Sequence, residues 1–272
     1  MVQPICPLCR AKLLPDAAVW RCENGHCFDV ARQGYVNLLP VSQKHSLHPG
    51  DTKEMVAARR EFLASGLYAP IAETLCALLA PHAPETVLDV GCGEGYYLSA
   101  VGRALPDAAL WGIDISKDAV RYAAGANKRA QFLTASAAHL PFPDGSFSAV
   151  VSMFALTCPE EFARVMQQGG IFVQVLAGAA HLLGLKRIIY PEIIEKEKTL
   201  HPTLPGFTPL SQQTLEFEFE LETNRQIQCL FSMTPHVFRI TEEGAARLRA
   251  AKQLRDRAQV IFNVYRADQD EG

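Results

Sequence analysis

The middle of the chain alternates short, continuous apolar runs with longer stretches of helical composition. Continuous apolar runs are typical of strands that are buried on both faces of a sheet. Strands that alternate with helices favour a parallel sheet with right-handed crossover connections. We therefore expect strands at residues 87–90, 110–114, 131–134, 147–154 and 171–176, and helices at residues 96–105, 117–125 and 159–167.

Two helices are expected before this alternation begins. The first runs from residue 53 to about residue 65, because Asp51 or Thr52 can cap its start and Gly66 can end it. The second helix is expected at residues 69–79, and it leads into the first strand.

A different pattern follows the fifth strand. Residues 215–221 alternate Leu or Phe with Glu, which is typical of a strand with one buried face. A helix near residues 241–254 and a last strand at residues 260–266 are expected to complete the sheet.

Residues 87–97 read Val-Leu-Asp-Val-Gly-Cys-Gly-Glu-Gly-Tyr-Tyr, and the rest of the chain is organised around them. A glycine-rich turn between a strand and a helix lets the backbone approach a nucleotide-like ligand closely. The next expected strand ends at Asp114, about 25 residues after Asp89. A carboxylate at that position can accept hydrogen bonds from both hydroxyls of a ribose.

The glycines follow the spacing G-x-G-x-G, which differs from the G-x-G-x-x-G of dinucleotide sites. This spacing resembles the first motif of class I S-adenosylmethionine-dependent methyltransferases. S-adenosylmethionine has no phosphate, so such a loop holds the methionine and ribose parts of the cofactor instead. We predict a cofactor site that contains Asp89, Gly91, Gly93, Gly95 and Asp114.

The composition of the 272 residues fits one large domain, or one domain with a small module. The net charge is −3, but residues 1–60 carry eight Lys and Arg residues against five acidic ones. A locally basic end permits contact with nucleic acid. No run of 18 apolar residues and no signal peptide is present, so we expect a cytoplasmic protein without membrane contact.

Four of the eight cysteines lie within the first 27 residues. Cys6 and Cys9 form a C-x-x-C pair, which places two thiolates within reach of one tetrahedral Zn²⁺ ion. The second pair of ligands comes from Cys22 together with either His26 or Cys27. Metal binding supplies most of the folding energy of modules this short, on the order of 10–16 kcal/mol.

Trp20 and Phe28 are expected to pack beneath the metal site, with an exposed stacking role for Trp20 as the alternative. We divide the chain into a zinc-binding module at residues 1–36, a linker with the first helix at residues 37–66, and a methyltransferase domain at residues 67–272.

Taken together, the chain resembles the RlmA family of 23S ribosomal RNA guanine-N1 methyltransferases over nearly its whole length. The resemblance depends on short stretches spread along the sequence. These stretches are residues 6–9, 22–26, 28–39, 49–51, 58–60, 91–97, 114–117, 140–142, 181–182 and 233–235.

The resemblance implies an α/β class I methyltransferase fold, Rossmann-like, with a seven-stranded and mostly parallel sheet plus a small amino-terminal zinc module. It implies S-adenosylmethionine and Zn²⁺ as cofactors, 23S ribosomal RNA as partner, and a homodimer as one form of assembly. By the family pattern the zinc ligands are Cys6, Cys9, Cys22 and His26, and the cofactor contacts are Tyr68, Tyr97, Leu98, Asp114 and His181.

The implied reaction methylates N1 of a guanine in an RNA hairpin, which requires loss of the N1 proton. Asp51, Glu54 and His181 are the candidate bases, and their spacing selects none of them. Phosphate contacts are expected from the basic residues of the amino-terminal half, with salt-dependent affinity. These residues are Arg10, Lys12, Arg32, Lys44, Arg59 and Arg60, of which the last two could instead form ion pairs on a helix surface.

Two functions of other classes stay open from the sequence. The first is methylation of a small molecule or a protein, with the zinc module serving only as a structural cap. The second is RNA binding without catalysis by a chain that retained the cofactor fold. Near the expected base site, residues 154–156 and 177–180 differ from the turns that are usual in the family.

Overall fold

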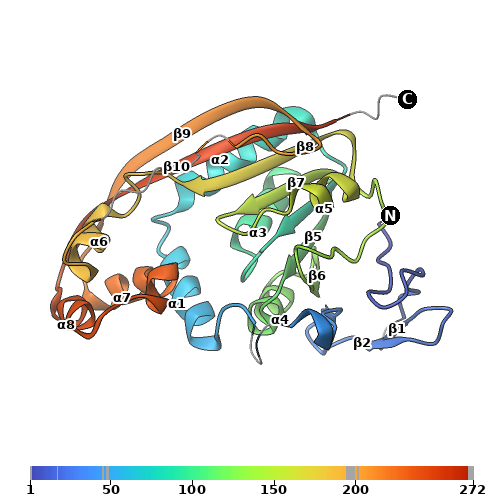
Figure 1. Cartoon of the computed structure of the whole chain (residues 1–272), viewed down its shortest axis with the longest axis horizontal. Coiled ribbons are helices and arrows are strands. Elements are labelled where there is room, and N and C mark those ends of the chain that lie inside the picture. The colour runs from blue at the N-terminus through green and yellow to red at the C-terminus, as the bar shows by residue number, and fades with distance from the viewer. Residues whose placement is uncertain are drawn as a thin grey trace.

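The computed structural model describes residues 2–16, 18–44, 46, 49–193, 200 and 202–268. In this part of the chain, eight strands form one sheet in the order β3-β6-β5-β4-β7-β8-β10-β9 (Figure 1). The strands are β3 (Val36–Asn37), β4 (Thr86–Val90), β5 (Ala109–Asp114), β6 (Gln131–Thr134), β7 (Phe147–Met153), β8 (Met166–Ala177), β9 (Phe207–Leu221) and β10 (Leu254–Ala267).

Eight α-helices accompany the sheet in the described part of the chain. They are α1 (Lys53–Ala64), α2 (Ala69–Leu79), α3 (Tyr96–Ala104), α4 (Lys117–Ala126), α5 (Pro159–Val165), α6 (Leu183–Ile189), α7 (Asn224–Ser232) and α8 (Glu242–Ala250). Six of them begin and end close to the residues expected from the sequence, whereas two, α6 and α7, were not expected. Thr52 caps α1 by accepting a hydrogen bond from the Met55 N–H, and Gly66 follows the helix with φ of 80°. No single described helix is long and apolar enough to span a membrane, and α1 with α2 passes that test only as a pair bent by 82°.

All seven strands expected from the sequence are present, with the predicted parallel pairing from β6 through β5, β4 and β7 to β8. Strand β10 runs antiparallel to both β8 and β9, as in a mostly parallel sheet. The structure differs from the expected sheet in two respects. The first is β3, a short strand at the start of the predicted linker, which pairs with β6 at the edge of the sheet. The second is that three strands begin earlier than expected, β8 at Met166, β9 at Phe207 and β10 at Leu254. The helix expected near residues 241–254 accordingly ends at Ala250. The division of the chain at residues 36 and 66 stays a prediction.

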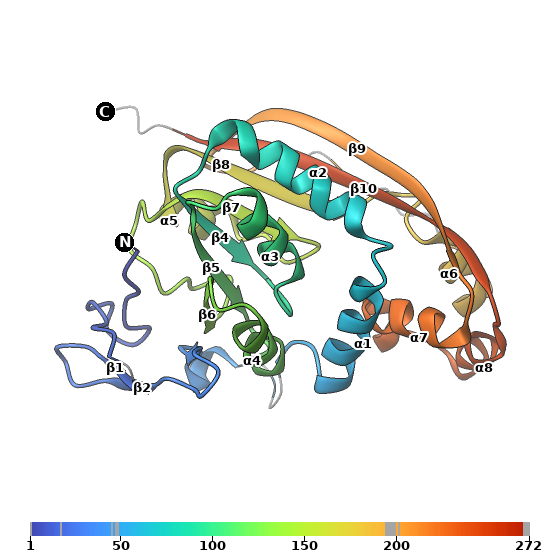
Figure 2. The same cartoon turned by 180° about the vertical axis from the view of Figure 1, so that it is seen from behind.

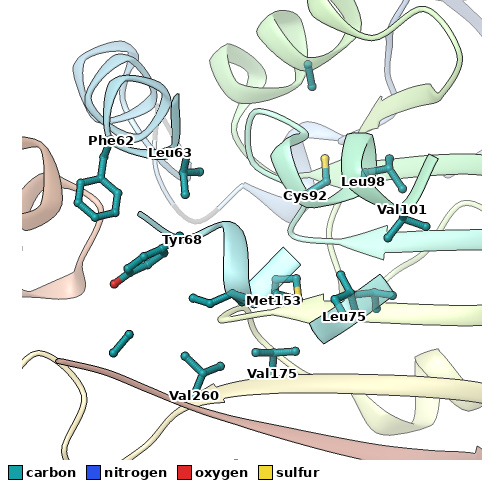
Figure 3. Packing of buried hydrophobic residues seen from close by; sticks show 14 of the residues in the cluster. Phe62, Leu63, Tyr68, Leu75, Cys92, Leu98, Val101, Met153, Val175 and Val260 are labelled. Carbon is teal, nitrogen blue, oxygen red and sulfur yellow. The ribbon is translucent and has the colours of Figure 1, made fainter. Parts of the chain in front are cut away.

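The sheet separates two hydrophobic cores. Successive residues of β4 point to opposite faces, so that Val87 belongs to one core and Leu88 to the other. Helices α2 and α3 cover the first face (Figure 2), and α5 covers the second (Figure 1). In the first core, Tyr68 packs edge-on against Phe62 of α1 at 4.9 Å between ring centroids (Figure 3).

The amino-terminal module packs into the second core. Its hairpin consists of β1 (Val19–Arg21) and β2 (Cys27–Asp29), in which Trp20 lies opposite Phe28. Trp20 is buried in the same cluster as Cys6 and Cys22. The predicted packing of Trp20 is therefore confirmed, and the alternative of an exposed stacking role is wrong.

Candidate active site and metal centre

The loop between β4 and α3 has the backbone conformation that its glycines predict. Gly91, Gly93 and Gly95 have φ angles of 79°, 54° and 82°, a region that other residues rarely adopt. At Gly91, a β-carbon would lie 2.5 Å from the β-carbon of Ala155. The backbone and the segment after β7 can approach this closely only because position 91 has no side chain.

Asp114 joins the loop to the end of β5. Its carboxylate accepts hydrogen bonds from the backbone N–H groups of Gly93 at 2.9 Å and Ser116 at 2.8 Å. Burial raises the pKa of Asp114, and these two hydrogen bonds act in the opposite direction. The second acidic position predicted from the sequence therefore lies directly beside the glycine loop.

Two further carboxylates, those of Asp89 and Glu94, lie in the same place with little access to solvent. Burial, followed by the nearby Asp114 and Glu94, raises the pKa of Asp89 to about 8. Burial also raises the pKa of Glu94 to about 6, against the opposing effect of Arg59. Asp89 Oδ1 and Glu94 Oε2 have no hydrogen-bond partner among the described residues. Unpaired buried carboxylates are costly, so the site is suited to a ligand that brings positive charge.

Two adjoining cavities open at this loop. The larger, about 370 Å³, lies between the loop and the segment Met233–His236, and the smaller, about 300 Å³, extends past Asp114 and Ile115. The two cavities share part of their lining, namely Arg59, Gly91, Met153, Phe154 and Ala155. A ligand that bound along the glycine loop would cross this junction.

The structure brings most of the predicted cofactor residues to these cavities. Tyr68, Tyr97 and His181 line the larger cavity, and Asp114 lines the smaller one. The buried Tyr68 hydroxyl has no hydrogen-bond partner among the described residues, and burial raises its pKa so that it stays neutral. Leu98 differs, because its side chain packs in the first core, and the predicted Asp89, Gly93 and Gly95 also lie outside the lining of both cavities. The contacts of all these residues with a cofactor stay a prediction.

The three candidate bases occupy different surroundings. The Asp51 carboxylate is paired with the Arg59 guanidinium. Glu54 is exposed, and hydrogen bonds from its own backbone N–H and from Thr52 lower its pKa. His181 lines the larger cavity, and its ring stacks on Phe154 with 6.0 Å between the ring centroids. Its Nδ1 accepts a hydrogen bond from the backbone N–H of Gln259 at 3.3 Å.

Sequence reasoning did not assign Arg59 or Glu94 to this site. Arg59 was expected at phosphates or on a helix surface, yet it lines both cavities. Its neighbour Arg60 points elsewhere, with its guanidinium 3.7 Å from the ring centroid of Tyr122. No local pattern separates the two arginines, because Asp51 precedes α1 and its contact with Arg59 depends on how the preceding segment folds back.

The metal ligands expected from the family pattern lie together in the amino-terminal module. Their ligand atoms, from Cys6, Cys9, Cys22 and His26, all lie within 4.8 Å of one another. The Sγ atoms of Cys9 and Cys22 are 3.7 Å apart, and the Sγ of Cys22 lies 3.4 Å from Nδ1 of His26. Such spacings fit a tetrahedral Zn²⁺ site, in which Zn–S bonds of about 2.3 Å give S···S edges of about 3.8 Å.

Cys27, the alternative ligand, lies outside this cluster. Its side chain is exposed, and its Sγ contacts the carbonyl oxygen of Gly25 and the guanidinium of Arg21, each at 3.3 Å. The arrangement therefore favours His26 as the fourth ligand.

Comparison with known proteins agrees with both parts of this arrangement. A family model described as the amino-terminal region of RlmA, a zinc ribbon, matches residues 5–47, and one described as a methyltransferase domain matches residues 87–170. The 23S rRNA (guanine(748)-N(1))-methyltransferase of Streptomyces fradiae is 39% identical over 80% of this chain and 79% of its own length. The chain belongs to the RlmA family. A second relative, from Micromonospora griseorubida and provisionally named as a 23S rRNA (guanine-N1)-methyltransferase, is 36% identical over 85% of this chain and 84% of its own.

Among solved structures, the YcgJ protein of Bacillus subtilis is 18% identical, covers 71% of this chain and 98% of its own, and has a TM-score of 0.45. The two family models and the curated relatives show that the RlmA-family chain is a methyltransferase with a zinc ribbon, and that its cofactors are S-adenosylmethionine and Zn²⁺. The zinc ribbon holds the four clustered candidate ligands, whereas the carboxyl ends of β4 and β5 meet at the glycine loop, where the cofactor contacts stay a prediction.

Proposed function

We propose that the protein transfers the methyl group of S-adenosylmethionine to N1 of a guanine in 23S ribosomal RNA. The observation that carries the proposal is the junction of the two cavities at Gly91 and Ala155. It offers one compartment to the cofactor beside Asp114 and a second compartment, lined by His181, to a target base.

The charges of the site match this cofactor. S-adenosylmethionine carries a sulfonium, an ammonium and a carboxylate, and therefore has a net charge of +1. Three carboxylates line the two cavities, those of Asp51, Glu94 and Asp114, against the single guanidinium of Arg59 among the acidic and basic groups at the junction. Excess negative charge in a buried site favours the positively charged cofactor over its neutral thioether product.

The chain's own residues account for the geometry of the transfer. The cofactor supplies a methyl group that its sulfonium already activates, so the protein mainly has to align it with N1. A guanine in a hairpin must leave its stack to enter the larger cavity. Among the three candidate bases, His181 lines that cavity, which supports it as the group that contacts the base. The products are N1-methylguanine and S-adenosylhomocysteine, and the N1 proton is released.

The proposal extends to the surroundings of the reaction. Ribosomal RNA as substrate implies that the protein works in the cytoplasm, where bacterial ribosomes are assembled. The basic amino-terminal half supports contact with RNA phosphates, and a homodimer is one form of assembly that the family resemblance implies.

The test uses purified protein, radiolabelled S-adenosylmethionine, and 23S ribosomal RNA from a strain that lacks the modification. N1-methylguanine cannot pair with cytosine, so a single new stop in primer extension is expected in a hairpin loop. Label in RNA without a stop would mean that another atom is methylated. No label in RNA, with S-adenosylhomocysteine still bound, would favour the non-catalytic RNA-binding function or a substrate that is a small molecule or protein.

A further inference from the structure

Arg59 and Glu94 face each other where the two cavities meet, and the resemblance assigned neither of them to the cofactor. Arg59 comes from α1 and Glu94 from the glycine loop, two segments that are 35 positions apart in the sequence. Arg59 Nε lies 3.8 Å from Glu94 Oε2, which is too long for a hydrogen bond. The two side chains are therefore close enough to contact one ligand, and no hydrogen bond between them occupies the facing atoms.

Both facing atoms are buried and lack a hydrogen-bond partner among the described residues. Arg59 Nε and Glu94 Oε2 are almost inaccessible to solvent and make no hydrogen bond there. The Glu94 side chain as a whole is 6% exposed. A buried donor and a buried acceptor that both lack partners, beside a cavity, indicate a ligand with one acceptor group and one donor group.

The surroundings orient the arginine toward that ligand. The Asp51 carboxylate accepts a hydrogen bond from Nη2 of Arg59. The other two nitrogens of the guanidinium, Nη1 and Nε, face the glycine loop. Nη1 lies 3.6 Å from the position that a β-carbon would have at Gly93. The guanidinium is thus held over the loop by a second charged group, as a bidentate anion site requires.

We propose that Arg59 and Glu94 bind the amino-acid end of the cofactor, with the guanidinium on its α-carboxylate and the Glu94 carboxylate on its α-ammonium. Asp51 then serves as a positioning residue, since it acts through Arg59 and not on the ligand. This inference rests on the proposed function. It gives the cofactor two anchors, Asp114 at the ribose and the Arg59–Glu94 pair at the amino acid, and the sulfur between them is thereby placed at the cavity junction.

Two ligands that differ only in the amino-acid end provide the test. S-adenosylhomocysteine carries the α-amino and α-carboxyl groups, whereas 5′-methylthioadenosine has the same adenosine and thioether without them. In calorimetric titrations, Arg59→Ala and Glu94→Gln should each weaken S-adenosylhomocysteine binding about 10- to 100-fold. Both variants should leave the affinity for 5′-methylthioadenosine within about twofold of the native protein.

Three companion variants sharpen the result. Arg60→Ala is the matched control, because Arg60 is the next residue on α1 but contacts Tyr122, and it should not change either affinity. Arg59→Lys keeps the positive charge but lacks the paired N–H donors of a guanidinium, so it should weaken S-adenosylhomocysteine binding by an intermediate factor. It replaces Arg59→Ala in the test if that variant fails to fold. Asp51→Asn should weaken S-adenosylhomocysteine binding by a smaller factor, again without an effect on 5′-methylthioadenosine.

The outcomes separate this inference from the function on which it rests. Equal losses for both ligands would assign Arg59 and Glu94 a merely structural role and overturn the inference. Unchanged S-adenosylhomocysteine affinity in Arg59→Ala and Glu94→Gln would do the same, while leaving the methyltransferase function intact. A native protein that binds neither ligand would overturn the proposed function itself, and the inference with it.

Discussion

At the scale of single residues, the glycine loop shows how burial changes the chemistry of an ordinary side chain. Glu94 follows Gly93, where the chain bends with positive φ, and this bend buries the carboxylate beside the cavities. Its pKa of about 6 reflects mainly the loss of solvent. Without a cofactor, the ionised form is therefore less stable in the folded protein than in the unfolded chain.

This difference predicts a dependence of stability on pH. Below pH 4.5 Glu94 is protonated in both states, and between pH 4.5 and about 6 only the folded state keeps its proton. The free energy of unfolding should therefore fall as pH rises through this window, by about 2 kcal/mol for a pKa difference of about 1.5. Urea unfolding of the cofactor-free native protein and of Glu94→Gln, each at pH 4 to 7, gives the two free energies of unfolding. The prediction is that the difference between these two free energies changes with pH across the window.

The exposed Glu220 provides the control for this measurement. Its side chain is 68% exposed on the outer face of β9, so Glu220→Gln should not change the pH dependence. A constant difference between the native protein and Glu94→Gln across the window would contradict the prediction, since Glu94 would then titrate equally in both states.

At the scale of secondary structure, α6 is stabilised by a residue that is remote in the sequence. The helix begins after Leu182, which has φ of 55° and supplies no side-chain cap. Asp256 of β10 caps the helix instead, because its carboxylate accepts hydrogen bonds from the backbone N–H groups of Gly184 at 2.9 Å and Leu185 at 2.7 Å. The helix and the adjoining His181 are thereby fixed to the sheet.

We expect Asp256→Ala to lower the free energy of unfolding by about 2–3 kcal/mol, because one buried and one part-buried N–H group lose their acceptor. Asp256→Asn keeps one acceptor oxygen and should lose about half as much. Urea denaturation measures both, with Glu220→Ala as an exposed control that should stay within about 0.5 kcal/mol of the native protein. A loss below 0.5 kcal/mol in Asp256→Ala would show that α6 does not depend on this cap.

At the scale of the whole molecule, the zinc ribbon is continuous with the methyltransferase core. Cys6 and Trp20 belong to the same buried cluster as Phe142 and Phe172 from the sheet and its turns. The backbone N–H of Ile5 donates to the carbonyl oxygen of Pro141 at 2.9 Å. The chain then passes directly into β3 at the edge of the sheet. Loss of the metal should therefore affect the whole protein and not only the ribbon.

Substitution of one zinc ligand tests this coupling. Cys22→Ser should abolish the binding of one Zn²⁺ per chain and lower the single calorimetric Tm by about 10 °C or more. Cys27→Ser alters the residue directly after His26 and should retain both the zinc and the Tm, because Cys27 is exposed and lies outside the ligand cluster. Two separate transitions in Cys22→Ser, the main one unchanged, would show that the ribbon and the sheet unfold independently.

The sequence by itself determined the elements whose signals are local. The apolar runs located β4 to β8, and the capping and ending residues Thr52 and Gly66 fixed the ends of α1. The glycine spacing with Asp114, and the C-x-x-C pair with Cys22, pointed to the two sites because such spacings fix which groups a single turn brings together. The choice of His26 over Cys27 already needed the family pattern, since both follow Cys22 within one short loop.

Only the tertiary structure decided the features that depend on contacts between distant segments. Strand β3 has two residues and forms because β6 offers it an open edge, so its sequence carries no periodicity to detect. Helix α6 depends on Asp256 from β10, about 70 residues away. Arg59 and Arg60 are adjacent and chemically identical, and the packing of α1 alone directs one to the two cavities at the glycine loop and the other onto Tyr122. A side chain's role at this site follows from what the fold places opposite it, which no local pattern contains.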